Sequence, residues 1–131
     1  MSAGILDTSV IIDWDDAAVT AALPDESAVS VITLAELAAG PHLAADPAER
    51  ARRQTRLQQV EALFDPLVLD AAVARSYGQV VAAVVAAGRT HRRRVADLLI
   101  AATALANQLP LYTRNAGDLS GLEAAITIIS I

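Results

Sequence analysis

Four acidic residues lie beside the ends of predicted strands or the starts of predicted helices, although they come from distant parts of the sequence. They are Asp7, Glu36, Asp97 and Asp118. Carboxylate oxygens are the ligands that hard cations such as Mg²⁺ and Mn²⁺ prefer, and one or two such ions support phosphodiester hydrolysis. Clustered carboxylates repel and raise one another's pKa, so four that converge in a folded protein indicate a bound cation.

The composition excludes several other chemistries. The chain of 131 residues contains no cysteine, which removes disulfides, thiolate catalysis and zinc–thiolate sites. All ten basic residues are arginine, so the lysine of a P-loop or of a Schiff-base enzyme is missing. The only histidines are His42 and His91, too few for a histidine-rich zinc site. The net charge of −5 argues against general coating of nucleic acid.

The elements that must position the acids alternate between strands and helices. We predict strands at 4–7, 27–32, 66–69, 111–113 and 126–131, with helices near 8–14, 33–39, 47–64, 70–87 and 95–107. Such alternation predicts an α/β fold with a central parallel sheet of four or five strands, covered by helices on both faces. We expect one domain over residues 1–131.

The predicted topology brings the acids to one rim. Asp7 ends the first strand, Glu36 follows the second in the first turn of its helix, and Asp118 lies five residues beyond Thr113. The helix that carries Asp97 leads back into the strand at 111–113, so its first turn starts at the same edge. Ligand sites of parallel sheets lie at this carboxyl edge.

Each acid also has a purely structural interpretation. Asp7 can cap the helix that follows it, Asp118 can be a turn residue, and Glu36 with Thr33 has the spacing of a capping box. Asp97 can favour a helix N-terminus through the helix dipole. Its neighbours in 95–100 are apolar, however, and burying an unpartnered acid is costly, which favours a functional role.

Polar and basic residues flank these acids. Hydroxyl and amide groups that could bond a ligand carboxylate or a phosphate, or simply cap and turn the chain, belong to Thr8, Ser9, Thr113 and Asn115. The loop before the Asp97 helix is basic and could position RNA or be merely solvated; it contains Arg89, Arg92, Arg93 and Arg94. A second arginine group at 50–56 lies on a helix, where Glu49 is placed to pair with Arg53, and it suits solvent or a partner.

At these residues the sequence resembles the PIN-domain ribonucleases, in particular the VapC-type toxins of type II toxin–antitoxin pairs. The matching segments are Leu6–Val10, Thr33–Leu37, Asp97–Ala104 and Thr113–Asn115 with Asp118. They occur in the family order and the resemblance covers nearly the whole chain. Leu119 and Gly117 depart from the family pattern, which often has phenylalanine and a larger polar residue there.

The resemblance implies an endoribonuclease that cleaves RNA with one or two Mg²⁺ or Mn²⁺ ions and a metal-activated water. Asp7, Glu36, Asp97 and Asp118 would be the catalytic, metal-binding acids, supported by Thr8 or Ser9 and by Asn115. It also implies a homodimer or a toxin–antitoxin hetero-oligomer, an antitoxin that blocks the site, and contact with promoter DNA only through that antitoxin.

Two other functions remain open from the sequence. A catalytically degenerate PIN-like module would only pair with a partner protein. An aspartyl-phosphate phosphatase or a receiver domain also uses an acid after the first strand, but Ser9 replaces the second acid of the phosphatase and no lysine exists. The longest uncharged apolar runs, 80–88 and 98–106, are too short to span a membrane, and no targeting segment is visible, so we expect a cytoplasmic protein.

Overall fold

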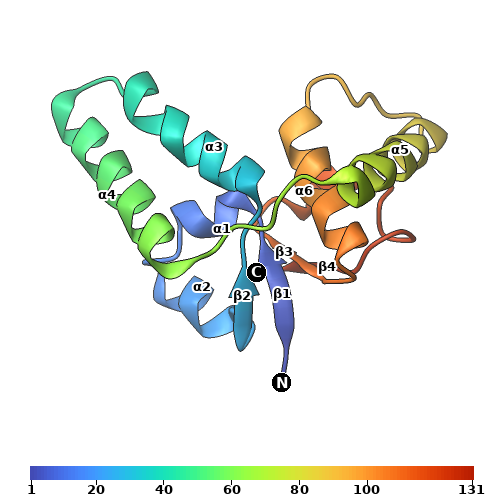
Figure 1. Cartoon of the computed structure of the whole chain (residues 1–131), viewed down its shortest axis with the longest axis horizontal. Helices are drawn as coiled ribbons and strands as arrows, with labels where there is room; N and C mark the ends of the chain where they lie inside the picture. The colour runs from blue at the N-terminus through green and yellow to red at the C-terminus, as the bar shows by residue number, and fades with distance from the viewer.

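The computed structural model describes all residues from 1 to 131 and contains one parallel four-stranded sheet (Figure 1). The strands run in the order β2-β1-β3-β4. Their bounds are β1 Ala3–Leu6, β2 Glu26–Ala28, β3 Leu111–Thr113 and β4 Ile128–Ser130. The predicted parallel sheet is confirmed with four strands, because residues 66–69 contribute only an isolated bridge between Leu67 and Ser30.

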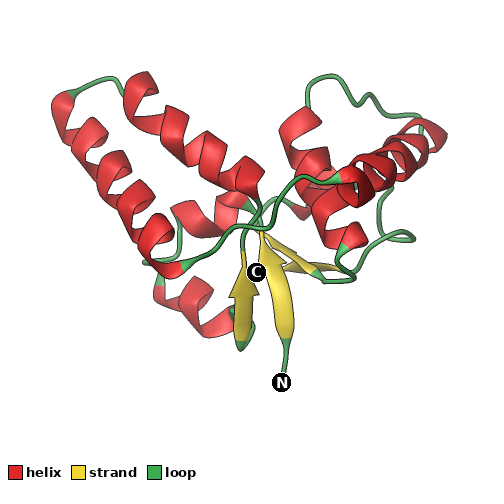
Figure 2. Ribbon diagram, in the orientation of Figure 1, coloured by secondary structure: helices red, strands yellow, loops and turns green.

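The helices lie outside the sheet (Figure 2). They are α1 Thr8–Ile12, α2 Ala17–Ala22, α3 Val31–Ala39, α4 Pro47–Leu63, α5 Ala71–Ala86 and α6 Val95–Ala106, with short 3-10 helices η1 Gly40–Leu43 and η2 Ala116–Leu119. Figure 1 shows α3 and α4 on one side and α5 and α6 on the other, with the two pairs diverging beyond the carboxyl ends of β1 and β2. None of these helices is long and apolar enough to cross a membrane.

The strands separate two apolar cores. Successive side chains of a strand point to opposite faces, so Ile5 and Leu111 join a core with α5 and α6. Leu6 and Tyr112 join a second core with α1 to α4. Gly4 permits this close packing, because a Cβ atom there would lie 2.3 Å from the Tyr112 ring. The central strands β1 and β3 are therefore buried on both faces. They fix the positions of the residues that directly follow them.

Several helix boundaries follow the local signals in the sequence. Asp70 caps α5 by accepting from the Val73 amide, and Pro47 opens α4 as predicted. The boundary of α3 was predicted wrongly: the strand β2 ends at Ala28, and the Ser30 hydroxyl caps α3 by accepting from the Ile32 amide at 3.0 Å. The chain leaves the sheet early because Ser30 pairs with Leu67 instead, so α3 starts two residues before Thr33.

Candidate active site

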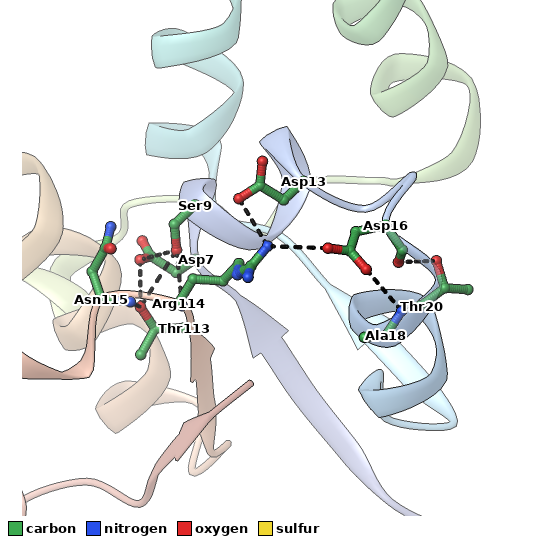
Figure 3. Close-up of polar contacts among 9 residues, drawn as sticks. All are labelled: Asp7, Ser9, Asp13, Asp16, Ala18, Thr20, Thr113, Arg114 and Asn115. Carbon is green, nitrogen blue, oxygen red and sulfur yellow. Dashed lines mark hydrogen bonds and ion pairs between the residues drawn. The ribbon is translucent and has the colours of Figure 1, made fainter.

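Asp7 is a buried carboxylate at the carboxyl end of β1 and accepts three hydrogen bonds, of which Figure 3 shows those from Ser9 and Thr113. Its Oδ1 accepts from the Thr8 amide at 2.9 Å, which also caps α1. Its Oδ2 accepts from the Ser9 hydroxyl at 2.9 Å and from the Thr113 hydroxyl at 2.8 Å. Asp7 therefore caps α1, and its carboxylate is held in a fixed orientation. The hydroxyl groups of Thr8 and Ser9 do not cap this helix.

Backbone amides orient the two hydroxyl groups that hold Asp7. The Arg114 amide donates to Ser9 Oγ at 3.1 Å, and the Asn115 amide donates to Thr113 Oγ1 at 3.0 Å. Each hydroxyl carries one proton and accepts a backbone hydrogen bond, so its own proton is directed to the carboxylate. The turn that follows β3 thus determines how the Asp7 carboxylate is oriented.

Glu36 lies in the second turn of α3, not in the first turn that the sequence predicted. Its Oε1 accepts from the Thr8 hydroxyl at 2.7 Å, and that hydroxyl lies 2.9 Å from the hydroxyl of the buried Thr33. Thr33 is therefore not the helix cap, but a buried contact that supports Thr8. Thr33 and Glu36 are three residues apart and therefore lie on one face of α3, where both contact Thr8. The capping box that the sequence predicted for this spacing does not form.

Asp97 is a half-buried acid in the first turn of α6, and no hydrogen bond or ion pair ends on its carboxylate. Its pKa is raised from 3.8 to about 6, first by desolvation and then by the charges of Asp7, Glu36 and Asp118. Arg94 opposes this rise only in part. A carboxylate without donors, within electrostatic range of three other acids, is what a cation would stabilise.

Asp118 is exposed in η2, where arginines from the basic loop hold the backbone. Arg94 donates to the carbonyl of Asp118 and lies 3.9 Å from its carboxylate, while Arg89 donates to the carbonyl of Gly117 at 3.2 Å. Two of the four arginines predicted to contact RNA are therefore already engaged within the chain. Arg92 and Arg93 are exposed, and neither side chain has a hydrogen bond or ion pair.

The four acids share one rim but do not form a closed ligand shell. Their mutual approach is visible in the electrostatic effect of Asp7, Glu36 and Asp118 on Asp97. No group of three or more acidic or histidine side chains comes close enough together to hold a metal ion in this arrangement. The donor set is nevertheless made only of carboxylates and hydroxyls, which suits a hard divalent cation.

A groove of about 490 Å³ leads away from this rim between α1, α3, η1 and α4. Thr8 and Glu36 lie at its site end, and the exposed apolar side chains Ile12 and Leu43 line it further along. On α4, Glu49 pairs with Arg53 at 3.1 Å, which confirms the pairing predicted from the sequence.

The supporting residues fall into two groups. Thr8, Ser9 and Thr113 each touch one of the acids through their hydroxyl groups. Asn115 contributes its backbone amide, whereas its exposed side chain makes no hydrogen bond within the chain. The sequence places these hydroxyl groups beside the acids, but it does not indicate the backbone donors behind them.

Comparison with known proteins gives a consistent set of matches. The model of the PIN domain family matches residues 4–120. Ribonuclease VapC5 of Mycobacterium tuberculosis is 36% identical over 129 residues, covering 97% of this chain and 93% of that protein. Ribonuclease VapC8 of the same species is 40% identical over 101 residues, covering 77% and 89%. The crystal structure of VapBC-5 from M. tuberculosis, a member of the VapBC family of toxin–antitoxin systems, matches with a TM-score of 0.82 and 34% identity over 100% of both chains.

Proposed function

The chain belongs to the PIN-domain family, and from this premise we propose that it is an endoribonuclease, the toxin of a toxin–antitoxin pair. Two relatives above 30% identity are named ribonucleases, and a structure at 34% identity belongs to a toxin–antitoxin system. One observation carries the proposal: the unpartnered Asp97 lies within electrostatic range of three other acids, including the buried Asp7. We take residues 1–131 as one nuclease domain.

The acids fit a hard divalent cation. Asp7, Glu36, Asp97 and Asp118 would hold one or two ions, for which we propose Mg²⁺ or Mn²⁺. Such an ion, when bound, would supply Lewis acidity at the scissile phosphate and would lower the pKa of a bound water molecule. The fit rests on the oxygen-only donor set and on an Asp97 carboxylate that no hydrogen bond occupies.

The remaining residues of the site hold these acids in place. Ser9 and Thr113 fix the orientation of Asp7, and Thr8 fixes that of Glu36. For RNA we propose the exposed Arg92 and Arg93, whose guanidinium groups are free to pair with phosphates.

The arginines bound to the turn at 117–118 have a different role in this proposal. Arg89 and Arg94 hold the backbone that carries Asp118. Their charges still add to the positive potential beside the acids, which favours the approach of an RNA backbone.

The partner of this toxin is an antitoxin protein, and any contact with promoter DNA goes through that partner. We propose that the antitoxin occupies the groove between α3 and α4, because a chain seated there covers Glu36 and the exposed Ile12 and Leu43. We further propose a homodimer or a toxin–antitoxin hetero-oligomer, located in the cytoplasm with the RNA substrate.

Expression of the protein in bacteria, with RNA 5′ ends sequenced, tests the proposal. The wild type should arrest growth and create defined new cuts, while Asp7→Asn should do neither at the same protein level. Identical cuts from the variant would remove Asp7 from the mechanism. Purified wild type that binds Mn²⁺ but cleaves no RNA would instead identify a degenerate binding module.

A further inference from the structure

Arg114, directly after β3, contacts both ends of the short helix α1 (Figure 3). Its backbone amide donates to Ser9 at the start of that helix, and its guanidinium reaches Asp13 at the end. We propose that Arg114 is a positioning residue for the Asp7 carboxylate, an inference that rests on the proposed function. Its side chain anchors the turn after β3, and its backbone then keeps the Ser9 hydroxyl directed at Asp7.

The backbone half of this arrangement is a chain of hydrogen bonds that ends on one oxygen atom. The Arg114 amide donates to Ser9 Oγ at 3.1 Å, and Ser9 Oγ donates to Asp7 Oδ2 at 2.9 Å. The neighbouring Asn115 amide supports Thr113 in the same way. A displacement of the turn after β3 would remove both supports together, because the two amides belong to consecutive residues.

The side-chain half connects that turn to the opposite end of α1. Arg114 Nη1 donates to Asp13 Oδ2 at 3.0 Å and lies 3.9 Å from Asp16 Oδ2. Asp13 is the C-terminal cap of α1, and Asp16 is the N-terminal cap of α2, where it accepts from the Ala18 amide. The backbone of Asp13 is held by α1 and the carboxylate of Asp16 is held by α2, so both acids offer an anchor to the guanidinium.

The sheet does not supply this anchor. The last backbone bond of β3 to its neighbour is the donation from Ile131 to the Thr113 carbonyl at 3.0 Å. Beyond Thr113 the chain leaves the sheet. The ion pair between Arg114 and Asp13 connects the turn after β3 to the C-terminal end of α1. Since the side chains of Arg114 and Asp13 are 33% and 48% exposed, we expect this pair to have only a small effect on global stability.

Arg114→Ala tests the proposal against Arg56→Ala as the matched control. Arg56 forms an ion pair of 2.6 Å with Asp15 on the same α1–α2 connection, but it does not contact the turn after β3. We expect Arg114→Ala to weaken Mn²⁺ affinity and kcat about tenfold with KM for RNA unchanged, as loss of a supporting contact does. Arg56→Ala should leave both unchanged.

The sign of the change in Mn²⁺ affinity separates geometry from charge. Arg114→Ala removes a positive charge and so reduces the repulsion of a cation at the site. A purely electrostatic role of Arg114 therefore predicts that the variant binds Mn²⁺ more tightly. Arg114→Lys should recover most of the lost affinity, because one nitrogen, Nη1, makes both contacts. A raised KM with kcat unchanged would mean that Arg114 contacts RNA, and this would overturn the proposal.

Asp13→Asn provides a second test in the metal-free protein, with Asp15→Asn as its control. Weakening the anchor while Arg114 remains should speed hydrogen exchange of the Arg114 amide, which donates to Ser9. Exchange at wild-type rates in both variants would overturn the proposal. If the wild type itself neither cleaves RNA nor binds Mn²⁺, the proposed function fails instead, and the exchange experiment still reports on the anchor.

Discussion

Replacing Asp97 with asparagine should stabilise the metal-free protein while removing its activity. The Asp97 carboxylate is desolvated, lies near three other acids and has no donor, which raises its pKa from 3.8 to about 6. A shift of about two units corresponds to about 3 kcal/mol at most, at 1.36 kcal/mol per unit. Because the side chain is only half-buried and solvent screens it, we expect about 1 to 2 kcal/mol.

The pH dependence of this difference has a definite sign. An acid whose pKa is higher in the folded state binds more protons there, so its contribution to stability is complete below the unfolded pKa near 4. That contribution is lost as the pH rises through about 6. Asp97→Asn should therefore match the wild type at pH 4 and exceed it above pH 6.

Urea unfolding in EDTA at pH 4.5 and pH 7.5 measures the effect, with Asp65→Asn as the control. Asp65 is exposed and makes no side-chain contact, so its replacement changes the net charge alone. Mn²⁺ at 100 times its Kd should then add about 2.7 kcal/mol to the wild type and much less to Asp97→Asn, which reverses their order. Equal stability at pH 7.5 in EDTA, or an advantage of Asp97→Asn that persists unchanged at pH 4.5, would refute the reasoning.

Three further substitutions test a hydrogen bond, a packing contact and the exposed arginines of the loop before α6. Thr113→Val removes a buried donor to the Asp7 carboxylate and should cost about 1 to 3 kcal/mol in urea unfolding and about tenfold in RNA cleavage; unchanged cleavage would contradict the hydroxyl's role. Gly4→Ala should destabilise by about 1 to 3 kcal/mol, because its Cβ meets the Tyr112 ring at 2.3 Å, and thermal unfolding measures this. Neutralising Arg92 and Arg93 with glutamine should lower the salt dependence of RNA binding, by a slope of about 1.4 for two phosphate contacts; an unchanged slope would place the RNA elsewhere.

Local sequence signals determined most of the secondary structure. Asp70, Pro47 and the apolar run after Asp97 each act within a few residues, through a cap, a fixed φ angle or a buried helix face, so their helices α5, α4 and α6 were predictable. The alternation of strands and helices likewise fixed the parallel sheet. The start of α3 was not predictable, because it depends on the bridge between Ser30 and the distant Leu67.

The sequence by itself determined which acids could meet, since the carboxyl ends of parallel strands share one edge. Only the tertiary structure decided how each acid is held. Asp7 depends on Thr113 and Glu36 depends on Thr8, across separations that no sequence pattern encodes. The ion pair between Arg114 and Asp13 likewise joins residues that are far apart in the sequence, so the residues around Arg114 do not predict it. Hydrogen bonds and charge interactions act over a few ångströms in space, so their partners are defined only once the chain has folded.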